Sequence, residues 1–173
     1  MIGAAIRGDL AGWTGLRGDA TRPLLEAELE PVTAVSGPVE AERPRERFGV
    51  LTFERPEEPR LVEAWFPVGA DRATLIEFDD GVVQDVDGLL DALGEPELEE
   101  TRKRFDPEAF VTEQVYASRG LTLSVATPFE HVEAPPPGTR RIVHVQLYEP
   151  TTPERWVGRI GAGLPLRPFP PRG

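Results

Sequence analysis

The fold is decided by residues 47–81, whose sequence is RFGVLTFERPEEPRLVEAWFPVGADRATLIEFDDG. This stretch contains three segments, 47–55, 60–68 and 73–81, that are rich in β-branched and aromatic residues. The connectors between them, PEEP and GADR, have the composition of turns. Because strands joined by such short loops pair in antiparallel fashion, the stretch predicts an antiparallel meander.

The middle segment of this stretch has two different faces. Val62, Ala64 and Phe66 alternate with Glu63 and Trp65, and alternate residues of a strand lie on opposite sides of a sheet. One side of the meander is therefore predicted to be apolar, and the other side mixes acidic and aromatic side chains.

A second group of strands is predicted further along the chain. Residues 113–129 have the pattern of a hairpin that turns near 118–120, with Leu121, Leu123 and Val125 facing the core. Residues 140–150 form the next expected strand. Its alternation predicts one face with Val143, Val145 and Leu147, and another with Ile142, His144, Gln146 and Tyr148.

Helices are predicted at four places in the sequence. Residues 21–30 have an N-cap candidate in Thr21 and apolar residues at helical spacing, and residues 151–161 combine Thr151 or Thr152 as N-cap with Pro153 in the first turn. Residues 86–93 form an apolar stripe, with Asp85 or Asp87 as the N-cap and Gly94 as the stop. The charge run 94–108 predicts a solvated helix, in which Glu99 precedes Lys103 by four residues.

These patterns together predict an α+β protein. We expect a single domain over residues 1–161, with a mainly antiparallel sheet of about six strands and two or three short helices on one face. Residues 1–46 are the least legible part of this domain. Residues 162–173 form a proline-rich tail whose composition favours polyproline II conformation.

The composition limits the classes of partner. The chain has 30 acidic and 19 basic residues, a net charge of -11, and no cysteine. A negative field repels phosphate backbones and anionic lipids, so we expect a basic protein partner and neither nucleic acid nor membrane. Ligand-rich metal motifs and cofactor-binding motifs are missing, so no metal or cofactor is expected. Abundant arginine with a single lysine is typical of a GC-rich bacterial genome, and no signal-peptide or membrane-spanning pattern is present, so the expected location is the cytoplasm.

The hypothesis favoured by these features is a bacterial, non-catalytic protein-binding domain. A toxin-neutralising (immunity-type) protein or an assembly or accessory protein would have this composition. The candidate partner-binding residues are Trp65, Glu63 and Trp13 in the domain and Leu164, Pro165, Pro168, Phe169 and Pro171 in the tail. Tryptophans near acidic residues are frequent protein-binding anchors, and core packing is the alternative for each of them.

The second hypothesis is a small enzyme that uses a polar cleft on the sheet. His144 would be its general base, with Tyr148 on the same strand face and with Arg119 or Glu77 nearby. The serines lack the glycine pattern of a nucleophile elbow, and the chain contains no phosphate-binding glycine loop. The sequence therefore favours binding over catalysis.

Overall fold

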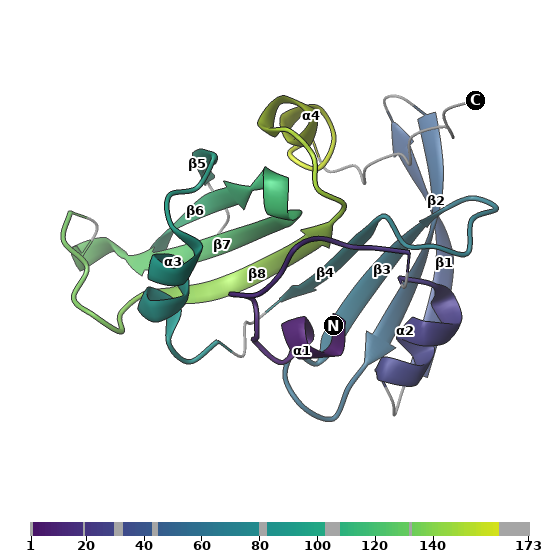
Figure 1. The fold of residues 1–173 in the computed structure, drawn as a ribbon, viewed down its shortest axis with the longest axis horizontal. Helices are drawn as coiled ribbons and strands as arrows, with labels where there is room; N and C mark the ends of the chain where they lie inside the picture. Colours follow the sequence, from purple (N-terminus) through teal and green to yellow (C-terminus); the bar gives the residue numbers. More distant parts are fainter. Residues whose placement is uncertain are drawn as a thin grey trace.

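One antiparallel sheet forms the centre of the computed structural model, which describes residues 2–18, 20–29, 33–42, 45–79, 83–102, 108–131 and 133–162 (Figure 1). Eight strands are present in these residues, in the order β1-β2-β3-β4-β8-β7-β6-β5. They are β1 (Thr33–Glu42), β2 (Arg45–Glu54), β3 (Leu61–Pro67), β4 (Leu75–Asp79), β5 (Leu98–Arg102), β6 (Ala109–Tyr116), β7 (Leu121–Pro128) and β8 (Arg141–Tyr148). The α+β prediction is confirmed, whereas the predicted numbers of about six strands and two or three helices are both too low, because the described residues also form four α-helices.

The two strands that the sequence did not predict, β1 and β5, lie at the two edges of the sheet. β1 contains Pro38, which lacks a backbone donor and is tolerated at an edge. β5 falls inside the charge run 94–108, so the helix predicted there is wrong. A dense set of charges suits a solvated edge strand as well as a solvated helix, and the run has no apolar stripe to distinguish them.

The sheet consists of two meanders of four strands each. β1 to β4 pair in sequence, as do β5 to β8, and the two groups meet where β4 pairs with β8. Helix α2 (Arg22–Glu28) precedes the first meander and helix α3 (Val86–Leu93) precedes the second. The chain therefore passes twice through the same plan of one helix and four strands.

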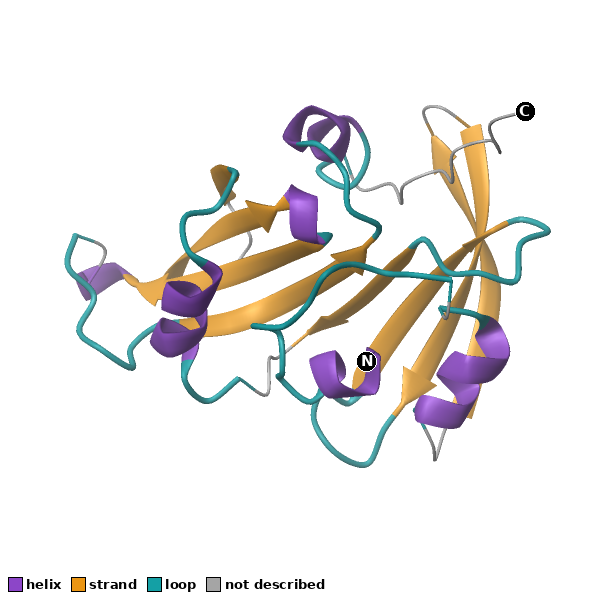
Figure 2. Cartoon of the chain, viewed as in Figure 1, coloured by secondary structure: helices purple, strands orange, loops and turns teal. Residues whose placement is uncertain are grey.

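Helices lie over one face of the sheet, here called the helical face (Figure 2), and the main core is on this face. Helix α1 (Ile2–Ile6), the segment that follows it, α2 and α3 all contribute buried side chains to this core. Asp85 caps α3 as predicted, since its Oδ1 accepts from the Gly88 backbone N–H at 2.9 Å. The sheet contributes, among others, Val62, Ala64, Phe66, Leu121, Leu123 and Val125, which confirms the predicted core-facing sets of the two hairpins.

The other side of the sheet, here called the opposite face, has a smaller apolar cluster at one end. Helix α4 (Pro153–Gly158) places Trp156 there against Tyr148, Leu75 and Val115. Two short 3-10 turns complete the fold, η1 (Ala117–Arg119) and η2 (Phe129–His131). Within the part of the chain that the structure describes, no helix is long and apolar enough to cross a bilayer.

A bulge in the β7–β8 pairing changes the predicted faces of β8. Ser124 pairs with His144 and Val125 pairs with Ile142, so Val143 is the extra residue. Ile142 consequently joins the main core, while Val143 packs against a small cluster of Ala109, Val111 and Ala126 on the opposite face. The predicted alternation holds for residues 144–148 and is wrong for residues 142 and 143, because a bulge breaks the period of two.

Gly120 allows the chain to pass very close to the end of β8. Its φ is +65°, and a Cβ at this position would lie 2.0 Å from the Tyr148 carbonyl oxygen. The Gly120 carbonyl accepts a hydrogen bond of 3.1 Å from the Trp13 indole Nε1. The predicted turn at residues 118–120 is therefore confirmed, and it is tied to both β8 and the N-terminal segment.

Candidate functional site

Polar side chains form two adjacent rows on the opposite face of the sheet. In the first row Glu63 of β3 pairs directly with Glu77 of β4, and Glu77 pairs with Gln146 of β8. In the second row Asp79 of β4 pairs with His144 of β8, and His144 pairs with Ser124 of β7. Directly opposed residues on one face have Cβ atoms about 5 Å apart, so the two rows form one cluster across the β4–β8 joint.

His144 lies between two carboxylates of β4. Its Nδ1 contacts Asp79 Oδ1, and its Nε2 lies 3.4 Å from Glu77 Oε1. Gln146 Nε2 donates to the same Glu77 oxygen at 2.7 Å. Burial opposes ionisation of Glu77, but the contacts with His144 and Gln146 outweigh it and hold the pKa of Glu77 below its ordinary value. Glu77 is thus a paired carboxylate, and its side chain is only 17% exposed.

Glu63 differs sharply from its neighbour. No hydrogen bond or ion pair joins its carboxylate to any described residue, although the side chain is only partly exposed. Burial raises the pKa of Glu63, and the nearby charges of Glu77 and Asp79 raise it further. Like charges directly opposed across two strands are destabilising, and the attraction of His144, which contacts Glu77 and Asp79, offsets only part of this effect on Glu63.

Two buried oxygen atoms in the cluster also lack partners among the described residues. Gln146 Oε1 and Ser124 Oγ have no hydrogen bond, and these residues are 8% and 1% exposed. An unmade hydrogen bond at a buried acceptor costs about 1–3 kcal/mol. The Gln146 oxygen lies in the same row as Glu63, so the row carries one unpaired charge and one unpaired acceptor.

Trp65 supplies an aromatic surface beside Glu63. It is two residues further along β3, on the same face, and partly exposed. Phe48 packs edge-on against the indole, with 6.3 Å between ring centroids, and this contact fixes the ring. The Trp65 indole also lies close enough to Glu77 to favour its ionised form.

Ser124, His144 and Asp79 are the residue types of an acyl-transfer triad, and they lie side by side on three neighbouring strands. Their contacts differ from those of a triad, however. Both ring nitrogens of His144 face β4 carboxylates, and the Ser124 hydroxyl makes no hydrogen bond to the ring. A nucleophile requires a base within hydrogen-bond reach and access to substrate, and Ser124 has neither in this geometry.

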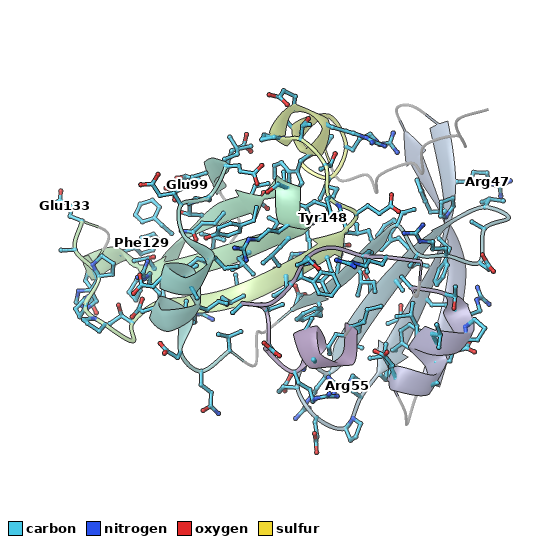
Figure 3. All side chains as sticks on the ribbon, viewed as in Figure 1. Arg47, Arg55, Glu99, Phe129, Glu133 and Tyr148 are labelled. Carbon is cyan, nitrogen blue, oxygen red and sulfur yellow. The ribbon has the colours of Figure 1, made fainter. Side chains whose placement is uncertain are left out.

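The residues of the enzyme hypothesis are not gathered in one site. Tyr148 is fully buried beneath α4, and its hydroxyl contacts Thr122 Oγ1 at 2.9 Å and donates to the Leu121 carbonyl at 3.1 Å. Burial raises the pKa of Tyr148 far above its ordinary value, so the phenol stays neutral. The Arg119 guanidinium donates to the Ala11 carbonyl in the N-terminal segment, away from His144. Figure 3 shows Tyr148 near the middle of the molecule.

The predicted partner-binding residues fall into three groups. Glu63 and Trp65 lie together on the opposite face. Trp13 is 1% exposed and part of the main core, so its side chain is not available to a partner in this fold. The predicted tail residues Leu164, Pro165, Pro168, Phe169 and Pro171 lie outside the described residues.

Two cavities of about 560 and 520 Å³ lie elsewhere on the molecule. The first is beside η2, where Phe129 and Arg141 contribute to its lining, and the second is between the N-terminal segment and α3. Neither of these two cavities is lined by His144 or Trp65. Within the described residues, no group of three or more His, Asp or Glu side chains has the arrangement of a metal site.

Comparisons with known proteins give no family for this chain. No protein-family model matches it, and neither the curated proteins nor the solved structures searched contain a significant match. The chemistry of the opposite face is therefore the basis for a proposal of function.

Proposed function

We propose that this protein is a non-catalytic binding domain whose opposite sheet face holds a basic segment of a protein partner. The contact region is centred on Glu63, Glu77 and Trp65. A toxin-neutralising protein or an accessory subunit of an assembly is the class of protein that works in this way. The proline-rich tail is proposed to extend the contact.

The observation that carries this proposal is the unpaired, partly buried Glu63 carboxylate opposite Glu77. The Glu63 carboxylate destabilises the free protein, and its presence is explained if a partner supplies the opposite charge on binding. Asp79 adds further negative charge at the edge of the same cluster, with its side chain 75% exposed. The net charge of -11 would also speed the approach of a basic partner.

The test uses a synthetic peptide of alternating basic and glycine residues and calorimetric titration at low ionic strength. We expect Glu63→Gln to weaken binding about tenfold, because a fixed charge pair in a partly desolvated site is worth about 1.4 kcal/mol or more. Glu57→Gln is the matched control, since it removes the same charge from an exposed turn of the same sheet. It should change the affinity less than about twofold.

An equal loss of affinity in the two variants would contradict the proposal, because it would mean that only the net charge attracts the peptide. Failure of every basic peptide to bind would contradict it as well. The contribution of the tail is tested in the full-length chain by substituting Leu164 and Phe169 with serine, which is expected to weaken binding of the basic peptide in the same titration.

A further inference from the structure

Glu63 and Trp65 together define the kind of cation that fits this site. Residues two apart on a strand lie on the same face, about 7 Å from each other. One offers an unpaired carboxylate and the other an indole ring that Phe48 holds in place. We propose that the site takes the guanidinium group of an arginine side chain presented by the partner. This inference rests on the function proposed above and names the chemistry of its central contact.

A guanidinium matches both groups at once. Its planar fork of N–H donors pairs with a carboxylate in bidentate fashion, while its flat face stacks on an aromatic ring. A lysine ammonium is a compact, strongly hydrated charge, so it loses more hydration on entering a partly buried site and gains no stacking. The apolar surroundings of Trp65, which packs against the cluster that includes Leu75 and Tyr148, increase that difference.

The neighbouring groups assist this contact without competing for it. Glu77 is already engaged by His144 and Gln146, so it contributes negative potential, and Glu63 remains the acceptor for the fork. Gln146 Oε1 is an unpaired acceptor at the far end of the row, beyond Glu77. A partner segment that crosses β3, β4 and β8 therefore meets one carboxylate without a partner, while the Gln146 amide oxygen lies buried beneath the surface.

The experiment compares three peptides that differ only at their basic positions, namely arginine, lysine and citrulline in an alternating sequence with glycine. Binding to the full-length protein is followed by NMR, using the indole N–H signal of Trp65 identified with Trp65→Phe. We expect the arginine peptide to bind at least about fivefold more tightly than the lysine peptide, and the uncharged citrulline peptide not to bind. In calorimetric titrations, which do not need the Trp65 signal, Trp65→Leu should reduce arginine affinity more than lysine affinity, because it removes the stacking surface.

If the arginine and lysine peptides bind with equal affinity and Glu63→Gln abolishes the binding of both, the arginine assignment is overturned and the proposed function stands. Loss of both peptides to the same extent in Glu63→Gln and Glu57→Gln would instead overturn the proposed function. The tail contains Arg167 and Arg172. If the arginine peptide binds only after both are changed to glutamine in the full chain, the site is filled from within the molecule and the assignment to a partner is overturned.

Discussion

Glu63 and Glu77 face each other on adjacent strands, yet the structure predicts opposite effects when each is changed to glutamine. Glu63 makes no hydrogen bond or ion pair within the described residues and is repelled by its neighbour, so Glu63→Gln removes a like-charge contact worth about 0.2–1 kcal/mol. The free energy of unfolding should rise by that amount. Glu77 accepts from Gln146 and contacts His144, and hydrogen bonds to a charged group are worth about 1.5–3 kcal/mol. After subtracting the relieved repulsion, Glu77→Gln should lower the free energy of unfolding by about 1–2 kcal/mol.

Urea denaturation at neutral pH, followed by far-ultraviolet circular dichroism, measures both changes. The midpoint should shift up for Glu63→Gln and down for Glu77→Gln, with the slope unchanged in both, because the surface exposed on unfolding is the same. If Glu63→Gln is more stable and also binds the peptide more weakly, Glu63 shows the behaviour expected of a residue that is retained for binding at the expense of stability. A destabilised Glu63→Gln variant would refute the reasoning, since it would mean that the carboxylate has a stabilising partner.

Three further predictions follow from the structure. The first concerns pH. Because the pKa of Glu63 is raised in the folded chain, the folded state binds this proton more tightly than the unfolded state, and the contribution of Glu63 to the free energy of unfolding should fall as the pH rises from the ordinary glutamate pKa through the raised one. Urea titrations over this pH interval should show a flatter dependence of the free energy of unfolding on pH for Glu63→Gln. Gly120→Ala should lower the free energy of unfolding by about 2–4 kcal/mol, because the φ of Gly120 is positive and a Cβ there would meet the Tyr148 carbonyl. Gly12→Ala is the control for thermal melts: its Cβ meets nothing within 4 Å, so it should lower the free energy of unfolding by less than about 1 kcal/mol. Tyr148→Phe should cost about 1–2 kcal/mol in the same assay, because it leaves the buried Thr122 hydroxyl without its partner, and an unchanged melting temperature would contradict the hydrogen bonding described.

Much of the fold is predictable because its signals are local. The alternation of Val62, Ala64 and Phe66, the turn before Gly120 and the cap at Asp85 each depend on residues close in sequence, and the structure contains all three. The edge strand β5 was not predictable from its charge run, because a solvated strand and a solvated helix have similar compositions there. The extra residue Val143 depends on how β7 pairs with β8, which a single strand does not reveal.

The candidate site shows the same division. Alternation within one strand was enough to place Glu63 beside Trp65 on a mixed face. The contact between Asp79 and His144 joins residues 65 positions apart, and it depends on the register of β4 against β8. Asp79 and the two unpaired acceptors of Gln146 and Ser124 were therefore missed. The burial of Trp13 was also not predictable, because the segment around it has little regular pattern.

The joint between the two meanders has a consequence for how the protein folds and opens. Within each meander, strands adjacent in sequence pair with each other, so both can form through the closure of short loops. The pairing of β4 with β8 brings together residues as far apart as Leu75 and Tyr148, so it carries the larger loop-closure cost and is expected to form late. A segment bound across β3, β4 and β8 would contact both meanders and stabilise the pairing of β4 with β8. Amide hydrogens of β4 and β8 should then exchange more slowly in the bound protein. Their exchange rate, which reports how often the two meanders separate, would measure the fraction of protein that has the segment bound.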